Sequence, residues 1–175
     1  MTGRQRRRQY EYQQLMRFAE ERSDIDIAVT RQDADGIPYA YIVTYHIHSI
    51  CGVKDDQSPI FADCFLMTID IPEDYPQVDA PPHFHFVKES SATDIHCPIP
   101  WHPNIRYYGE MSGHVCINQL NTFTDISWGV ERVSLYLRYE LYHAILESPY
   151  PEDLKVAEWV RHIGEPNDYV FFNQT

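Results

Sequence analysis

Residues 101–116 read WHPNIRYYGEMSGHVC, and they hold the side chains of this sequence that are best suited to covalent chemistry. A cysteine acts as a nucleophile when it is accessible and when its surroundings favour the thiolate or supply a base. Here Cys116 follows a His-Pro-Asn turn, in which His102 and Asn104 supply polar groups and Pro103 restricts the backbone. Two reactions fit these residue types. One is hydrolysis by a Cys-His-Asn set, and the other is acyl transfer through a cysteine thioester, with the asparagine amide as a donor to the oxyanion.

The remaining cysteines, at positions 51, 64 and 97, are widely spaced and form no CxxC pair. This spacing favours free thiols in a reducing compartment over a disulfide framework or a zinc ribbon. Cys51 and Cys64 lie in or beside strand-like runs and are expected to be small core residues. Cys97 lies in an irregular stretch, where a thiol can meet a substrate.

Histidines offer a metal site as a less favoured alternative. The pairs His46/His48 and His83/His85 would each share one face of a strand, but neither pair has further ligands at the spacing of a zinc site. A second candidate set also lacks the closely spaced pairs of structural zinc sites: His96, Cys97, His114 and Cys116. We therefore expect no metal and no cofactor.

The composition indicates one folded domain spanning residues 1–175, because 43% of the residues are hydrophobic and 14% are aromatic. Four of the 14 basic side chains are arginines within residues 1–8, which leaves ten basic against 26 acidic side chains in the rest of the chain. Such an acidic body disfavours a nucleic-acid partner. No apolar run approaches the ~20 residues of a membrane helix, and no hydrophobic segment follows the first arginines, so a cytoplasmic protein without a membrane partner is expected.

Hydrophobic periodicity predicts an α+β fold. Residues 6–22 carry one helical stripe, and period-two alternation then predicts strands at 25–32, 39–50, 60–71 and 83–87, which together form a four-stranded antiparallel meander. Residues 90–127 show no sustained period, and so long a loop in a compact domain is usually functional.

Two helices are expected after this loop. A long one begins near Val130 and is predicted to end at Ser148-Pro149, because proline cannot continue the hydrogen-bond ladder. The last helix, with Leu154, Ala157 and Val160 on one stripe, should stop at Gly164.

The order of several short motifs resembles the ubiquitin-conjugating enzyme family. PEDYP, PPHFHF, HPNI, GHVCIN, a tryptophan and a helix ending in SPYPED follow one another here. In the family, an aromatic-proline loop, the HPN motif, the active-site cysteine, a downstream tryptophan and a Pro-rich helix end come in the same order. The resemblance spans roughly residues 6–163, and the HPN motif followed by the cysteine is its specific part.

The resemblance implies a UBC-like fold, which agrees with the element order above. It implies that Cys116 accepts a ubiquitin-like modifier from an activating enzyme as a thioester and passes it to an amine, usually a lysine, of a target protein. Asn104 would stabilise the oxyanion, and His102 would support the turn structurally. Because the N-terminal helix of this family contacts the activating enzyme, Arg6, Arg7 and Arg8 are expected to bind that partner, although a basic run is most often a solvated helix start.

Several positions depart from the family pattern. Eleven residues separate Asn104 from Cys116 where seven are common, and the stretch from Cys116 to Trp128 is four residues longer than is common. Ser148 stands where many members have an acid near the incoming lysine. Gln77 follows the Tyr-Pro of the ligase-docking loop in place of an apolar residue, and Gly129-Val130-Glu131 replaces Ser-Pro-Ala, so docking of a common-type ligase is not expected. These departures are compatible with a divergent member, for example a bacterial one.

Two alternatives to a conjugating enzyme stay open. A non-catalytic module of the same fold would bind a ubiquitin-like protein, but such variants lack the cysteine. A cysteine hydrolase would be expected to place its nucleophile at a helix start and not in a long loop.

Overall fold

A computed structural model describes the chain except for residues 78–79, 92, 118–124 and 174–175. Helix α1 (Gly3–Glu20) begins at a capping box, in which the side chain of Thr2 accepts the N–H of Gln5 and the side chain of Gln5 accepts the N–H of Thr2. Leu15 on its inner face is fully buried. The expected N-terminal helix is thus confirmed.

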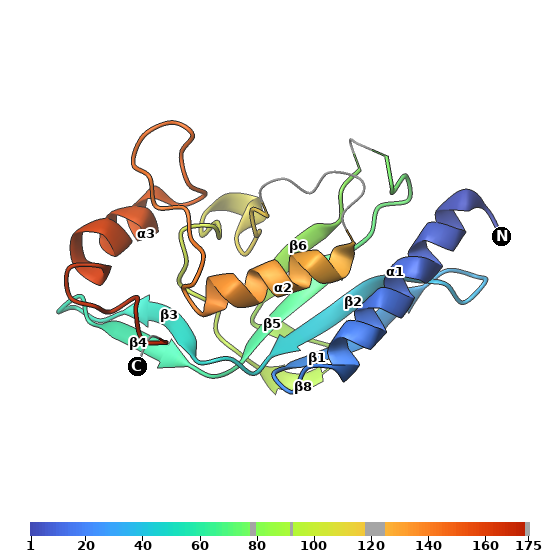
Figure 1. Cartoon of the computed structure of the whole chain (residues 1–175), viewed down its shortest axis with the longest axis horizontal. Helices are drawn as coiled ribbons and strands as arrows, with labels where there is room; N and C mark the ends of the chain where they lie inside the picture. The colour runs from blue at the N-terminus through green and yellow to red at the C-terminus, as the bar shows by residue number, and fades with distance from the viewer. Residues whose placement is uncertain (78–79, 92, 118–124, 174–175) are drawn as a thin grey trace.

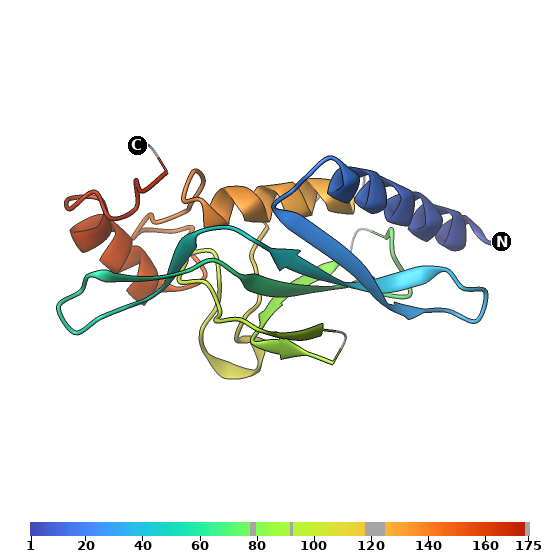
Figure 2. The same cartoon turned by 90° about the horizontal axis from the view of Figure 1, so that it is seen from below.

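The four-stranded antiparallel sheet has the order β1-β2-β5-β6 (Figure 1). Its strands are β1 (Ile25–Gln32), β2 (Pro38–Tyr45), β5 (Phe65–Asp70) and β6 (His83–Val87). Tyr41, Val43 and Tyr45 are fully buried on the face that α1 and α2 cover, as their alternation predicted (Figure 2). The α+β meander expected from the sequence is confirmed.

The strands expected at 39–50 and 60–71 are each divided in two. Beyond β2 and before β5, the chain forms a separate hairpin from β3 (Ser49–Val53) and β4 (Pro59–Ala62). Figure 1 shows this hairpin at the end of the molecule opposite the start of α1. The break falls at residues 46–48, where the side chains of His46 and His48 turn to Asp26 and Asp63.

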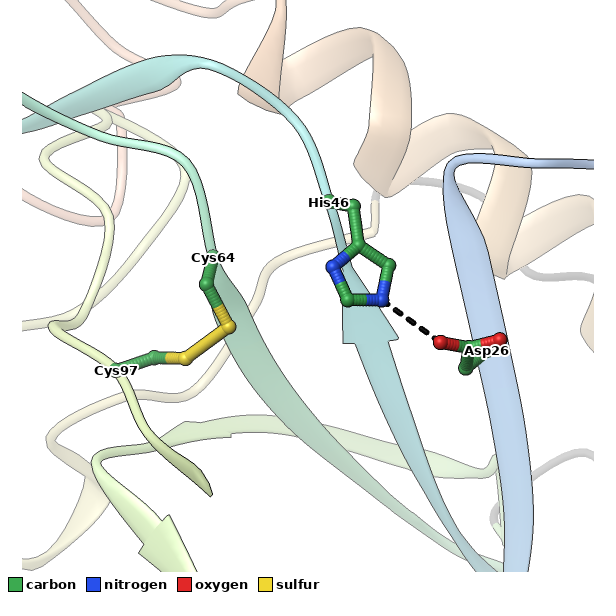
Figure 3. The surroundings of a disulfide bond; sticks show 4 residues. All are labelled: Asp26, His46, Cys64 and Cys97. Atoms are coloured by element: carbon green, nitrogen blue, oxygen red, sulfur yellow. Dashed lines mark hydrogen bonds and ion pairs between the residues drawn. A yellow bond between two sulfur atoms is a disulfide. The ribbon is translucent and has the colours of Figure 1, made fainter.

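The other face of the sheet carries a short hairpin of β7 (Glu89–Ser90) and β8 (Thr93–His96) (Figure 2). Cys97 follows β8 and forms a disulfide with Cys64, which precedes β5, with their Cα atoms 5.7 Å apart (Figure 3). The expectation of four free thiols is therefore wrong. Cys97 is fully buried with Ile42 and Leu66 and is not available to a substrate. The sequence spacing of 33 residues does not reveal that the fold brings the two cysteines together.

Helix α2 (Ile126–Leu137) is shorter than the periodicity predicted. Just after its end, Tyr139 adopts a left-handed conformation with φ 55°. Residues 141–143 then use their backbone groups to bind the His-Pro-Asn turn, as described below. The predicted end at Ser148-Pro149 is thus wrong, since contacts from another part of the chain stop the helix earlier.

The last helix has the bounds that the sequence predicted, but the expectation that Leu154 lies on its buried stripe is wrong. Helix α3 (Leu154–Trp159) begins at Asp153, whose side chain accepts the N–H of Val156 at 3.1 Å, and continues as a π-helical turn, η2 (Val160–Gly164). Val156, Ala157 and Val160 form a second core with the β3–β4 hairpin, but Leu154 is exposed. Within the described part of the chain, no helix is long and apolar enough to cross a membrane.

Candidate active site

The segment between Asn104 and Cys116 is a hairpin and not an open loop. The N–H of Cys116 donates to the carbonyl of Asn104 at 2.9 Å, and the N–H of Arg106 donates to the carbonyl of His114 at 3.0 Å. The hairpin also joins the edge of β6, where the N–H of Val115 donates to the carbonyl of Phe84 at 3.0 Å. A 3-10 turn, η1 (Gly109–Met111), forms its tip. These hydrogen bonds place the backbone of Cys116 beside Asn104 of the His-Pro-Asn turn.

His102 is a buried hydrogen-bonding residue that ties the turn to the chain after α2. Its Nδ1 accepts the N–H of Asn104 at 3.2 Å, and its Nε2 donates to the carbonyl of Leu141 at 3.2 Å. The ring stacks on Tyr136, with 4.9 Å between centroids. Burial lowers the pKa of His102 to about 3, so the ring is neutral at ordinary pH and has no free nitrogen with which to act as a base.

Asn104 is also buried, and its side chain has a partner within the protein. The oxygen Oδ1 accepts the N–H of His143 at 2.9 Å. His102 and Asn104 together thus bind the backbone of residues 141–143, which explains why these residues do not continue α2.

Cys116 is half-buried, on the side of the hairpin opposite the buried Val115. Burial raises the pKa of its thiol to about 11, and the negative charge of the Glu152 carboxylate acts in the same direction. Arg106 and Arg132 act in the opposite direction. The sulfur is therefore protonated in the resting protein at neutral pH.

Glu152 and Arg106 are functional candidates that the sequence reasoning missed. Arg106 Nη2 lies 2.7 Å from Oε2 of Glu152, so an ion pair stands beside the cysteine. Glu152 belongs to the SPYPED stretch, four residues after Ser148. An acidic residue in the Pro-rich stretch was the sequence signal that could have pointed to Glu152.

The arginines at the start of α1 differ in exposure, because some dock on the fold and others face solvent. Arg8 is buried and donates to the carbonyls of Pro72 and Glu73, at 3.2 and 3.3 Å. Arg7 pairs with the buried Glu11 at 2.6 Å, whereas Arg6 is exposed. Figure 1 places the start of α1 far from the hairpin that carries Cys116. Of the three expected partner-binding residues, Arg6 alone presents an exposed side chain.

Within the described residues, no group of three or more His, Cys, Asp or Glu side chains could hold a metal ion. The alternative zinc set loses Cys97 to the disulfide. The longer stretch between Cys116 and Trp128 falls largely on residues 118–124, which lie outside the described part of the chain.

Comparisons with known proteins support the fold. No protein-family model matches the sequence, and no curated protein matches it either. Among solved structures, a candidate ubiquitin conjugating enzyme from Plasmodium yoelii aligns over 95% of this chain and 88% of its own, with a TM-score of 0.55 and 18% identity. A ubiquitin conjugating enzyme E2 from Plasmodium vivax aligns over 75% of this chain and 98% of its own, with a TM-score of 0.48 and 20% identity. The Plasmodium yoelii structure shows that the chain is similar in fold to a ubiquitin-conjugating enzyme, and it gives no support to a bacterial origin.

Proposed function

We propose that this protein is a conjugating enzyme that carries a ubiquitin-like modifier as a thioester on Cys116 and transfers it to an amine of a target protein. The observation that carries the proposal is the backbone pairing of the half-buried Cys116 with Asn104 of the His-Pro-Asn turn. The partners would be the modifier, an activating enzyme and the target. We place the reaction in the cytoplasm, where the Cys64–Cys97 disulfide would be an exception to the usual reduced state of thiols.

In the first step, the Cys116 sulfur loses its proton and attacks the modifier's C-terminal carbonyl, which arrives as a thioester on a cysteine of the activating enzyme. A new S–C bond forms, the old C–S bond breaks, and the leaving thiolate takes up a proton. The high pKa of the resting thiol opposes this step. Binding of the activating enzyme would therefore have to favour the thiolate, for example by displacing Glu152.

In the second step, the amine of the target attacks the thioester carbonyl, an N–C bond forms, and Cys116 leaves as a thiolate. The amine proton passes to a base, and Glu152 is the carboxylate beside the sulfur. Oxyanion stabilisation by Asn104 would require its NH2 group to reach the carbonyl oxygen while its Oδ1 holds His143.

The geometry favours this reaction over hydrolysis by a Cys-His-Asn set. Such a hydrolase needs a histidine that takes the thiol proton, but both nitrogens of His102 are engaged by Asn104 and Leu141. A non-catalytic binding module would have no need of a carboxylate whose charge acts on the cysteine thiol.

A charging assay tests the proposal. The protein is incubated with ubiquitin, its activating enzyme and ATP, and separately with a chemically prepared ubiquitin thioester, and adducts are resolved on a non-reducing gel. We expect a reducible adduct with the unaltered protein and with Cys51→Ala, the matched control at the other cysteine outside the disulfide, but none with Cys116→Ala.

An adduct that persists in Cys116→Ala would contradict the assignment. No adduct in both assays would favour the non-catalytic binding module. Release of free ubiquitin from the thioester without an adduct would favour the hydrolase.

A further inference from the structure

Arg106 and Glu152 form a partly shielded ion pair over the cysteine. Arg106 Nε and Nη2 lie 3.0 and 2.7 Å from the same oxygen, Oε2 of Glu152, and the two side chains are 32% and 18% exposed. Besides burial, the negative charge of the Glu152 carboxylate raises the pKa of the Cys116 thiol and the charge of Arg106 lowers it, so both members of the pair act on the sulfur. The ion pair and the cysteine sulfur are therefore coupled electrostatically.

Each member of the ion pair is fixed by its own element. The backbone of Arg106 is paired within the hairpin, where its carbonyl accepts the N–H of Gly113 at 2.7 Å, and its guanidinium lies 5.4 Å from the ring centroid of Tyr108. On the other side, the carbonyl of Glu152 accepts the hydroxyl of Tyr108 at 3.4 Å. The N–H of Asp153 donates to the carbonyl of Pro103 at 3.2 Å. The ion pair thus joins the hairpin to the segment that enters α3.

We propose that Arg106 is a positioning residue that holds the Glu152 carboxylate against Cys116, so that the carboxylate is in place to take the proton of the attacking amine. The inference rests on the proposed function, because it assigns Arg106 a role in the transfer step. An unanchored glutamate has several rotamers and gains hydration by turning to water. The planar, rigid fork of an arginine restricts such a side chain to one geometry.

Several charged groups face this site. Glu152 and Arg106 act on the Cys116 thiol together with Arg132 from α2. His114, two residues before the cysteine, faces both members of the ion pair, and burial lowers its pKa. Variants at Arg106 and Glu152 leave Arg132 and His114 in place, so their effects can be compared at constant surroundings.

The test is a double-mutant cycle read from the pKa of Cys116. This pKa is obtained from the pH dependence of alkylation by iodoacetamide, followed on the Cys116 peptide by mass spectrometry with the disulfide intact. Glu152→Gln should lower the pKa, because it removes a negative charge beside the sulfur. If Arg106 holds the carboxylate in place, Glu152→Gln lowers the pKa less when Arg106→Gln is also present.

The opposite coupling would overturn the proposal. An arginine that only screens charge leaves the carboxylate in place when it is removed, so Glu152→Gln would then lower the pKa by the same amount or more in the Arg106→Gln background. Arg106→Lys, which keeps the charge but not the fork, should restore part of the coupling. Melting curves of all variants show whether each one is folded. The cycle uses no modifier, so a failure of the proposed function would not affect it.

Single-turnover transfer from a preformed ubiquitin thioester to free lysine gives the second measurement. We expect Glu152→Gln to slow transfer by about 10²-fold, as for loss of a general base, and Arg106→Gln to slow it as well. The double variant should be no slower than Glu152→Gln alone, since both changes remove the same group from its place. A multiplicative loss in the double variant would show independent roles and contradict the positioning of Glu152 by Arg106.

Discussion

Asn104 accepts the backbone N–H of His143 through its side-chain oxygen at 2.9 Å, and so the amide expected to serve the oxyanion also holds the chain after α2. The two roles use different atoms of one side chain. The oxygen supports the fold, and the NH2 group is the one that could donate to a developing negative charge.

Asn104→Ala should lower both stability and transfer. Loss of the acceptor leaves the N–H of His143 without its partner, which costs about 1–3 kcal/mol of unfolding free energy. Loss of the donor should slow discharge to lysine by about 10²-fold. A melting curve and single-turnover discharge measure the two effects.

Asn104→Asp is the matched control, because a carboxylate still accepts the N–H of His143 but an ionised one cannot donate. If the melting temperature recovers and discharge stays slow, the amide serves the oxyanion. If the melting temperature and discharge both recover in Asn104→Asp, Asn104 has only a structural role. Undiminished discharge in Asn104→Ala would lead to the same conclusion.

Stability should fall on mild acidification because of His102. Burial lowers its pKa from 6.5 to about 3, so between these values the unfolded chain binds a proton that the folded protein does not. The stabilising contribution is complete above about pH 6.5 and is lost progressively as the pH falls toward 3. Between pH 6.5 and 5 the expected loss is about 1–2 kcal/mol.

Urea unfolding at several pH values measures this loss. His85 and His114 also have pKa values lowered by burial and contribute in the same direction. His102→Gln should therefore be less stable at pH 7.5 but lose less on acidification than the unaltered protein. An equal loss in the variant would show that His102 is not the group responsible.

The N-terminal arginines should separate into one that affects charging and two that affect folding. Arg6 is exposed, so Arg6→Glu should slow charging by the activating enzyme at low ionic strength and reduce its salt dependence, since exposed charges are screened over ~8–10 Å at ordinary salt. Unchanged charging would exclude this role.

Arg7→Met should instead lower the unfolding free energy by about 3 kcal/mol, because it leaves the buried carboxylate of Glu11 without its ion-pair partner. Glu11 would keep the N–H of Ile126 at 2.8 Å and the hydroxyl of Tyr75. Chemical unfolding of Arg7→Met and Arg6→Glu side by side distinguishes the two positions.

Removal of the Cys64–Cys97 disulfide should reduce stability without preventing thioester formation on Cys116. In the chain-entropy model, a loop of this size contributes about 3–4 kcal/mol. Cys64→Ala with Cys97→Ala, and the unaltered protein after reduction, should unfold at similar urea concentrations below that of the oxidised protein. Thiol titration of the oxidised protein in denaturant should find Cys51 and Cys116 alone, and four reactive thiols would contradict the pairing.

Local patterns in the sequence determined the regular elements and pointed to the site. Period-two runs place Tyr41, Val43 and Tyr45 on one face, because side chains alternate along a strand independently of what packs against it. The stripe around Leu15 and the Asp153 cap likewise depend on neighbours within a few residues. The His-Pro-Asn turn and Cys116 could be proposed as a site from their residue types and order.

Tertiary structure decided the features that depend on partners far along the chain. The end of α2 follows from contacts of the His-Pro-Asn turn with residues 141–143, which compete with helical hydrogen bonds and override a helical periodicity. The Cys64–Cys97 bond and the docking of Arg8 on residues 72–73 also need segments that lie far apart in sequence. The same is true of Glu152, which reaches Cys116 because the Pro-rich segment folds back onto the hairpin. Periodicity predicts which face of an element is buried, but the residues that pack against that face depend on the tertiary fold of the whole chain.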